Sequence, residues 1–459
     1  MGDSMRPEGY CMANCYRALV RWSRECGLGR WAFANAPSPC PLSQRGRGAL
    51  GWALGVALAG MLTVAAAETS AATRYREDVE FLAKHTKVLE LSNDHGARIA
   101  ICPAYQGRVM TSTCDGPEGR SFGWINREFI TKGENDPVFN NYGGEDRFWL
   151  APEAGQFALF FAHGAKQEFS NWRTPAMLNE GEFRVASGPR EPFVRMLRRM
   201  QVDSAAETRF SLWVERAVRL VDEHEFAQSF GDEAASALSQ GAVKWVGFET
   251  NNSVTNEGSA MDEATGLVSI WILGMFQPGP KTVIIVPYHA GDANGAPIVN
   301  TDYFGALPPE RLRATPSAVL FRGDGQYRSK LGIPRERVKP VAGAIDFEAG
   351  VLTLVHFTLP AKHAESMYVE NRWQLPQTKP YAGDVFNSYN DGPTEPGAAS
   401  LGGFFELETL SPASPMKRGQ QMVHVHRTIH VQGELPALAR VAKAALGVDL
   451  EAIRQEFAR

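Results

Sequence analysis

The chain has 459 residues, of which 44% are hydrophobic, 21% are charged and 10% are aromatic, a composition that excludes a disordered or fibrous protein. The formal net charge is −4, but residues 1–67 hold seven arginines against three acidic residues, which leaves −8 for the rest of the chain. Residues 68–459 are therefore acidic, which argues against nucleic acid or an anionic membrane as a partner.

Residues 1–67 have the order of a secretory leader. An uncharged stretch, residues 49–67, follows Arg45 and Arg47 and ends in three alanines. Basic, apolar and small residues in that order are typical of a cleaved signal peptide, whereas a membrane anchor would be longer and less rich in Ala and Gly. We therefore expect an exported protein, periplasmic or extracellular, with no membrane contact beyond the leader and a single domain over residues 68–459.

Strand patterns dominate the chain after the leader. Residues 74–85 place apolar side chains at helical spacing and predict a short N-terminal helix, and the same spacing returns only in residues 223–240 and 435–457. Between them lie short β-branched segments bounded by Gly, Pro, Asn or Asp, which are typical of strands. The predicted strands are residues 87–91, 97–102, 108–113, 183–186, 210–221, 243–248, 267–273, 282–288, 318–322, 351–359, 404–410 and 422–431. So many strands with so few helices predict an all-β fold, a large antiparallel β-sandwich with a short N-terminal helix and a C-terminal helix.

Two of the six cysteines, Cys102 and Cys114, lie outside the leader, on neighbouring predicted strands. A disulfide between them would suit an oxidising compartment, and two buried free thiols are the alternative. No cysteine spacing typical of a zinc site is present.

Three segments in chain order resemble the aldose 1-epimerase (galactose mutarotase)-like superfamily. Residues 97–112 resemble its opening hairpin, with a Pro turn and a Gly-Arg step between two strands. Residues 142–153, Tyr-Gly-Gly-Glu-Asp-Arg-Phe-Trp-Leu-Ala-Pro-Glu, resemble the segment that supplies a sugar-binding arginine, and residues 404–412 resemble the strand that carries the general base. The set is more similar to an uncharacterised secreted bacterial branch than to the housekeeping mutarotases. This resemblance implies a galactose mutarotase-like sandwich that holds a sugar.

Glu408 is the candidate general base. Ring opening of an aldose needs a base for the proton of the anomeric hydroxyl and an acid for the ring oxygen. Glu406 lies two positions earlier and shares its strand face, so the two carboxylates would raise one pKa, and Glu406 is a candidate for substrate binding. The alternative is that both glutamates are solvated while Phe405 and Leu407 fill the core.

Further candidates for substrate binding come from polar segments predicted as turns and loops. Arg147 lies in a Gly-rich turn, where it could give fork-like hydrogen bonds to sugar hydroxyls, with Trp149 offering a ring face. A structural ion pair of Arg147 with Glu145 or Asp146 is the alternative. Residues 322–330 and 383–392 are predicted loops dense in donors and acceptors, where either binding groups or plain turn chemistry are expected. They contribute the candidates Asp324, Lys330, Asn387 and Asp391.

The resemblance implies a catalytic histidine on the strand near residues 265–272, and this sequence has none there. Ser269 and Trp271 stand about where it is expected, which puts ordinary mutarotation in doubt. His163, in the segment Phe-Ala-His-Gly, is a replacement candidate for the acid, with a structural turn residue as its alternative.

Three histidines of one predicted strand, His424, His426 and His430, would share one face, and we expect this strand to lie beside the two glutamates. Histidines two positions apart with nearby carboxylates can hold a divalent metal, so His424 and His426 are candidate ligands. The alternative is a partly exposed polar strand. His426 and His424 are candidate acids even without a metal, and no other cofactor is predicted.

Two functions of different class follow. In the first, the protein is an enzyme that acts on an aldose or on an oligosaccharide end by proton transfer, with Glu408 as base and a histidine as acid. In the second, it is a non-catalytic sugar-binding protein that lost the acid. A polysaccharide lyase or glycosidase-like activity is the runner-up within the enzyme class. The expected partner is a mono- or oligosaccharide, and the sequence predicts neither the sugar nor the oligomeric state.

Overall fold

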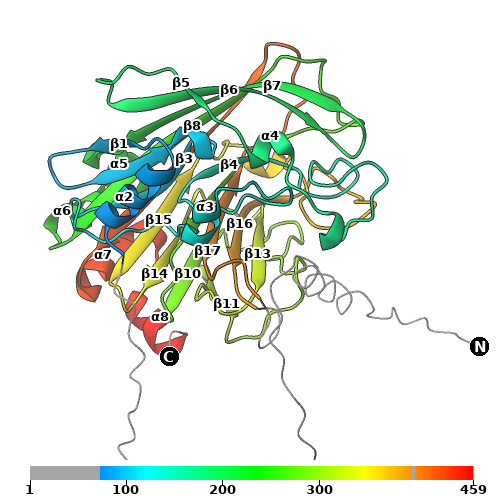
Figure 1. Cartoon of the computed structure of the whole chain (residues 1–459). Coiled ribbons are helices and arrows are strands. Elements are labelled where there is room, and N and C mark those ends of the chain that lie inside the picture. The colour runs from blue at the N-terminus through cyan, green and yellow to red at the C-terminus, as the bar shows by residue number, and fades with distance from the viewer. Residues whose placement is uncertain (1–72, 394–398, 458–459) are drawn as a thin grey trace, which may run out of the picture. The chain divides into compact units, whose positions relative to one another are not determined.

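The computed structural model describes residues 73–393 and 399–457, which belong to one compact unit (Figure 1). The leader predicted for residues 1–67 lies outside the described residues. Three antiparallel sheets with few helices build the unit, so the all-β sandwich predicted from the strand pattern is confirmed. None of the described helices is both long enough and apolar enough to cross a membrane.

A five-stranded sheet with the order β13-β16-β17-β9-β4 forms one layer of the sandwich. Every residue of its five strands is buried, so both faces of the sheet are covered. One face packs on the second sheet and loops cover the other. The strands are β4 (Arg147–Ala151), β9 (Ser269–Phe276), β13 (Ser329–Pro334), β16 (Asp384–Asn390) and β17 (Phe405–Leu410).

A ten-stranded sheet with the order β11-β12-β10-β14-β15-β18-β8-β7-β6-β5 forms the other layer. Burial alternates along its long strand β7, because one face meets the core and the other meets solvent. The strands are β5 (Arg184–Val185), β6 (Phe193–Asp203), β7 (Arg209–Leu220), β8 (Lys244–Asn256), β10 (Thr282–Pro287), β11 (Leu312–Ala314), β12 (Ala318–Arg322), β14 (Val341–Asp346), β15 (Val351–Phe357) and β18 (Gln421–Gln432).

The main core lies between these two sheets. Phe148 and Leu407 of the five-stranded sheet belong to the same buried cluster as Val214 and Phe248 of the ten-stranded sheet. At about 25 cal/mol per Å² of apolar area removed from water, this cluster is the largest favourable contribution to the fold.

A small sheet, β1-β2-β3, packs beside the sandwich with the N-terminal helix α2 (Tyr75–His85) and the short helix α3 (Arg127–Lys132). Its strands are β1 (Leu89–Ser92), β2 (Arg98–Cys102) and β3 (Arg108–Thr113). Both cysteines are buried free thiols, so the disulfide alternative is wrong. Cys102 pairs with Arg108 next to the turn, whereas Cys114 follows the pair Arg98↔Thr113 at the open end, so the two lie about 15 Å apart.

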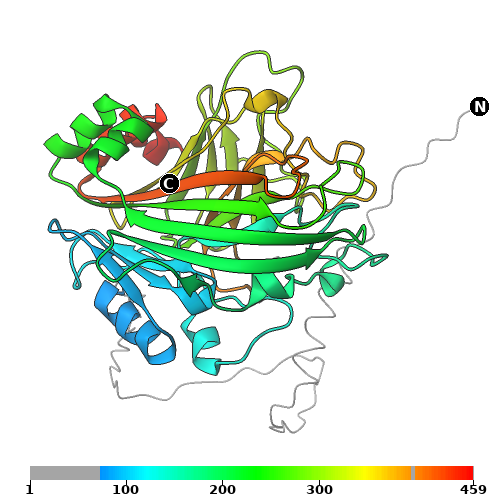
Figure 2. The same ribbon diagram turned by 90° about the horizontal axis from the view of Figure 1, so that it is seen from above.

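Helices also cover the outer face of the ten-stranded sheet, where they gather at one end of the long strands (Figure 2). Leu438 and Val441 of the C-terminal segment pack there against Leu352 and Leu354 of β15. The predicted C-terminal helix is in fact two helices, because Gly447 ends the first in a left-handed conformation (φ 73°) and the Asp449 side chain caps the second. These helices are α5 (Glu223–Phe230), α6 (Asp232–Gln240), α7 (Leu435–Leu446) and α8 (Leu450–Glu456). Single turns elsewhere are α4 (Ala176–Asn179), η1 (Pro103–Tyr105), η2 (Phe169–Asn171) and η3 (His363–Glu365).

The loop prediction for residues 383–392 is wrong, because most of this segment is the buried strand β16. Its polar side chains resemble a loop in composition, but most of them find hydrogen-bond partners inside the fold. Ser388 Oγ donates to the Glu406 carbonyl at 2.6 Å, and Asn390 Nδ2 donates to the Tyr327 carbonyl at 2.8 Å. Residues 322–330 are a turn as predicted, except that Ser329 and Lys330 already belong to β13.

Candidate functional site

Polar side chains cover the outer face of the five-stranded sheet, the face turned away from the ten-stranded sheet. Side chains alternate along a strand, so Glu406 and Glu408 of β17 share this face while Leu407 enters the core. The register places Tyr389 directly opposite Glu406 and Asn387 directly opposite Glu408 on the neighbouring strand β16. The predicted pairing of the two glutamates on one face is therefore correct, and the strands on either side add further polar groups to it.

Two buried ion pairs hold these glutamates. Arg147 Nη2 of β4 lies 3.0 Å from Glu406 Oε1, and Lys330 Nζ of β13 lies 3.0 Å from Glu408 Oε2. Trp271 Nε1 also donates to Glu408 Oε2, at 3.1 Å. The side chain of Glu408 has no exposed surface and that of Glu406 is 9% exposed, so the alternative of solvated glutamates is wrong.

Burial sets the protonation of this cluster. It raises the pKa of Glu406 to about 7; the charge of Glu408 acts in the same direction and Arg147 opposes it. Burial also lowers the pKa of Arg147. The Lys330 pKa rises despite burial, because the Glu408 and Glu153 carboxylates favour its charged form. Glu406 is thus a carboxyl group that exchanges its proton near neutrality beside a lysine that stays charged.

Three buried polar atoms of the cluster have no hydrogen-bond partner within the described part of the chain. They are Glu408 Oε1, Asn387 Oδ1 and Arg147 Nε. Glu408 and Asn387 lie opposite each other on neighbouring strands, so both free acceptors belong to the same face of the sheet. Most buried polar groups in proteins are paired, so these three atoms are free to bond to another molecule; unpaired buried atoms also occur elsewhere, for example Glu145 Oε1 and Arg216 Nη1.

A chain of hydrogen bonds extends the cluster along the sheet. Asn387 Nδ2 donates to the Tyr303 hydroxyl at 2.8 Å, and that hydroxyl donates to Asp384 Oδ2 at 2.7 Å. Burial, reinforced by the charge of Glu370, raises the pKa of Asp384 to about 7. Gly332 leaves room for this chain, because a Cβ there would lie 2.0 Å from Asp384 Oδ2. Sequence reasoning missed Tyr303 and Asp384.

Glu153 is a further acidic group that sequence reasoning did not select, although it ends the segment that contains Arg147. Its carboxylate accepts a hydrogen bond from Trp172 Nε1 at 3.0 Å. Burial raises its pKa, the Lys330 charge lowers it and the Glu408 charge raises it, so these three groups lie within electrostatic reach of one another. With Asp384, the cluster therefore has four carboxyl groups and two cations beneath the covering loops.

Trp149 and Arg147 are placed differently from their prediction. Arg147 is the first residue of β4 rather than part of a turn, and its partner is Glu406, since Glu145 bonds His430 and Asp146 bonds Arg216. The Arg147 guanidinium covers the Trp149 ring at 4.0 Å. The residues Phe139, Phe160, Trp172 and Trp271 surround that ring. Trp149 is 4% exposed, so its ring packs under the arginine instead of offering a free face.

Asp324 and Asp391 have structural partners. Asp324 forms a two-pronged ion pair with Arg311 at 2.7 and 2.8 Å. Asp391 accepts hydrogen bonds from the Tyr389 hydroxyl and from the backbone of Gly402 and Gly403. Both carboxylates fix loops at the edge of the site, as the turn alternative expected.

The histidines lie away from the glutamates. The expectation that the histidine strand lies beside Glu406 and Glu408 is wrong, because β18 belongs to the ten-stranded sheet and β17 to the other. His424 and His426 face the core, where both form hydrogen bonds with Thr409 Oγ1, at 2.8 and 3.0 Å, and Thr409 points away from the glutamate face.

Burial lowers the pKa of both His424 and His426 to about 3, so both are neutral at physiological pH. No group of three metal-binding side chains occurs in residues 73–393 and 399–457, so the structure gives these two histidines no carboxylate partner for a metal. His163 lies in an exposed turn, where its Nδ1 bonds the Ala205 carbonyl at 2.8 Å, which agrees with the turn alternative.

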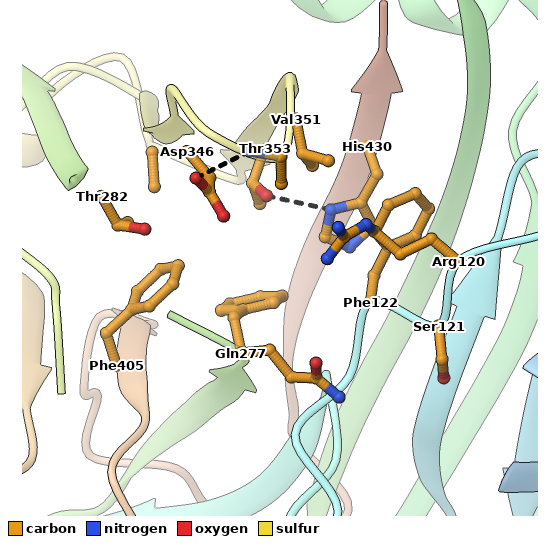
Figure 3. Close-up of a pocket in the computed structure, with 13 residues that line it drawn as sticks. Arg120, Ser121, Phe122, Gln277, Thr282, Asp346, Val351, Thr353, Phe405 and His430 are labelled. Carbon is orange, nitrogen blue, oxygen red and sulfur yellow. Dashed lines mark hydrogen bonds between the residues drawn. The ribbon is translucent and has the colours of Figure 1, made fainter. Parts of the chain in front are cut away.

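A small cavity of about 30 Å³ lies elsewhere, between the two sheets (Figure 3). His430 lines it and bonds Thr353 Oγ1 at 2.9 Å, while its other ring nitrogen bonds Glu145 at 2.8 Å. A cavity of this size holds about two water molecules. It is too small for a sugar. A larger surface hollow of about 450 Å³ lies on the ten-stranded sheet, where Gln201 and Asp203 of β6 and Arg209 of β7 are among the residues that line it.

Residues 73–457 match the sequence profile described as a family of unknown function, DUF6786. No curated protein matches the chain. Among solved structures, it is similar to the Slr1438 protein from Synechocystis sp. PCC 6803, at 13% identity and a TM-score of 0.44 over 76% of this chain and 96% of that chain. It is also similar to a candidate aldose 1-epimerase from Escherichia coli K12, at 11% identity and a TM-score of 0.43 over 75% of this chain and 99% of that chain. Both TM-scores lie below 0.5, so these likenesses assign no function to the chain.

Proposed function

We propose that this protein, which belongs to the DUF6786 family of unknown function, binds a sugar on the outer face of its five-stranded sheet and opens the sugar ring by proton transfer. The group of unpaired buried atoms carries this proposal. Glu408 Oε1 and Asn387 Oδ1 need hydrogen-bond donors, and Arg147 Nε needs an acceptor. A sugar hydroxyl is both donor and acceptor, so neighbouring hydroxyls of one ring satisfy all three atoms.

Glu408 acts as the base in this proposal. Its Oε2 is held by Lys330 and Trp271, which leaves Oε1 to accept the proton of the anomeric hydroxyl. The Lys330 ammonium group fixes Glu408 from one side at 3.0 Å, so the free oxygen stays turned toward the sugar. Low exposure strengthens these interactions, because little water competes for either oxygen.

Glu406 acts as the acid, in place of the histidine that the sequence lacks. Because its pKa is raised to about 7, it holds a proton in a large fraction of molecules near neutral pH. It gives this proton to the ring oxygen while Glu408 takes the hydroxyl proton, and the bond between the anomeric carbon and the ring oxygen breaks to leave an open-chain aldehyde. Ring closure on the other face of the carbonyl, with both protons returned, yields the second anomer.

A non-catalytic sugar-binding protein is the second candidate. The observation that favours it is the hydrogen bond from Trp271, at the position where the resemblance implies a histidine, to the candidate base. An indole N–H donates a hydrogen bond but does not transfer its proton. Such a protein would retain the hydroxyl-binding atoms without ring opening.

Proton NMR of freshly dissolved aldoses tests the proposal. We expect the wild-type protein to accelerate anomeric interconversion of at least one sugar, and Glu408→Gln to lose this acceleration because an amide does not accept the proton. Glu182→Gln makes the same change at an exposed glutamate and should retain wild-type rates. If sugar signals shift on binding but no anomer interconverts faster, the binding function stands and the enzyme proposal fails. If no sugar binds, both candidates fail.

A further inference from the structure

We infer that the surface beside Tyr389 binds a second sugar ring, so that the ligand of the glutamate site is an oligosaccharide rather than a free monosaccharide. This inference rests on the proposed function, since it assigns the substrate class of the same site. It is carried by the position at which the site opens and by the side chains that stand there.

One accessible corner of the site lies at Tyr389. Glu408 and Asn387 have no exposed surface, whereas Tyr389, Glu406 and Lys330 are, as whole residues, 7%, 6% and 8% exposed. These three residues are direct neighbours across strands β13, β16 and β17. This corner is one approach to Glu408, and the half-buried residues Tyr303 and Glu153 mark other accessible parts of the cluster.

An aromatic and cationic surface stands at that corner. We name it the Phe304 surface; it comprises Phe169, Phe304 and Arg328. The Phe304 ring lies 6.1 Å from the Tyr389 ring, edge to face. The Arg328 guanidinium lies 4.5 Å from the Phe304 ring centre and 5.6 Å from that of Phe169. Three separate loops thus bring their side chains together outside the glutamate cluster.

Exposure distinguishes this surface from core packing. Phe304 is 37% exposed, and it is one of the five large hydrophobic side chains that are exposed in the described residues. An exposed aromatic side chain at the mouth of a site indicates contact with a ligand. Here the neighbour of Phe304 is Tyr389, at the accessible corner of the glutamate site.

Arg328 is the second side chain that indicates ligand contact at the Phe304 surface. Its Nε is buried and donates to no acceptor among the residues that the structure describes. A pyranose ring has an apolar C–H face and a rim of hydroxyl groups, so it matches an aromatic ring with a guanidinium donor at its edge. The unpaired Nε therefore has a natural acceptor in a sugar hydroxyl.

The ring that contacts Phe304 differs from the ring that contacts Glu408. Tyr389 stands between them, because Phe304 packs on its edge while its opposite neighbour is Glu406. One sugar ring at Glu408 would leave the Phe304 surface empty, and a chain of two rings covers both. The ligand class is accordingly a disaccharide or a longer glycan that enters by one end.

Calorimetric titration of the full chain with glucose, galactose, maltose, cellobiose and lactose tests this assignment. We expect at least one disaccharide to bind roughly five- to tenfold more tightly than its component monosaccharides, the range that one aromatic contact gives. Phe304→Leu keeps an apolar side chain but removes the flat ring, and should reduce this preference to less than twofold. Phe304→Trp should retain the preference, because it restores a ring.

Val423→Ala is the matched control, since Val423 is 44% exposed on the outer face of the other sheet, and it should leave every affinity unchanged. If monosaccharides bind but no disaccharide binds more tightly, the second-ring site is wrong while the proposed function stands. The same holds if Phe304→Leu weakens both classes equally, which would mark a structural role. If none of the five sugars binds the wild-type chain, the proposed function fails and the second-ring site fails with it.

Discussion

Replacing Glu406 with Gln should remove one contribution, a loss of about 2.5 kcal/mol, from the change in unfolding free energy between pH 5 and pH 8. Burial raises the pKa of Glu406 from 4.5 to about 7, so the folded state binds this proton more tightly than the unfolded state does. A group whose pKa is higher in the folded state than in the unfolded state stabilises the fold fully at pH values below its pKa in the unfolded state. This stabilisation is lost as pH rises through its pKa in the folded state. Between pH 5 and pH 8, this one group costs about 2.5 kcal/mol of unfolding free energy.

Asp384 is expected to contribute a loss of similar size, because burial raises its pKa from 3.8 to about 7, and this part should remain in Glu406→Gln. Urea unfolding followed by tryptophan fluorescence at pH 5, 6, 7 and 8 measures both contributions. Glu182→Gln, at an exposed position, should keep the wild-type pH dependence. If Glu406→Gln and the wild type lose the same free energy over this range, Glu406 does not have a raised pKa and its role as the acid is refuted.

Three further changes test other parts of the molecule. Arg147→Met leaves the Glu406 carboxyl group buried without its cation, so urea unfolding at pH 8 should show a decrease of about 3 kcal/mol in unfolding free energy. Adding Glu406→Gln to this variant should restore part of that free energy. Fully additive losses of the two changes would contradict the ion pair. Gly332→Ala places a Cβ 2.0 Å from Asp384 Oδ2 and 2.8 Å from Asn387 Nδ2, so calorimetry should show weakened sugar binding. Gly188→Ala is the control, because the atom nearest to its Cβ is 3.8 Å away. Equal affinities of the two variants would show that the hydrogen bonds between Asn387, Tyr303 and Asp384 are not part of the sugar site. Burial lowers the pKa of His424 and His426 to about 3, so both side chains favour the folded state at neutral pH and destabilise it as pH drops below about 6.5. Replacing both with Gln should therefore shift the midpoint of acid unfolding to lower pH. An unchanged midpoint would contradict their burial as neutral groups.

The strand pattern predicts the fold class because alternation and β-branched runs report which faces are buried. It fails where the five-stranded sheet carries polar residues on both faces. In β16, Asn387 and Ser388 point to opposite faces. Asn387 bonds Tyr303 of a distant loop and Ser388 bonds Glu406 of β17, so local composition alone indicates a loop. The break of the C-terminal helix at Gly447 follows a local rule, since Gly and then Asp are typical stop and start signals.

The candidate site was predictable in part. Strand alternation alone places Glu406 and Glu408 on one face, and the resemblance directs attention to Arg147, which proves to be the partner of Glu406. The sheet that contains the histidines was not predictable, because antiparallel order does not follow from chain order. Tyr303 joins the cluster only through the fold, since it lies in a loop without a recognisable pattern and is brought to Asp384 across about 80 residues of chain.

The indole N–H of Trp271 offers the most direct test of the central claim, that a sugar binds at Glu408. This group donates to Glu408 Oε2, so its nitrogen-15 NMR signal, assigned by its loss in Trp271→Phe, reports directly on the base. We expect the signal to move as a bound sugar is added, while the signal of Trp213, under Arg199 on the outer face of the ten-stranded sheet, stays in place. A sugar that binds without moving the Trp271 signal, or that moves both signals equally, would contradict a sugar site on the glutamate face.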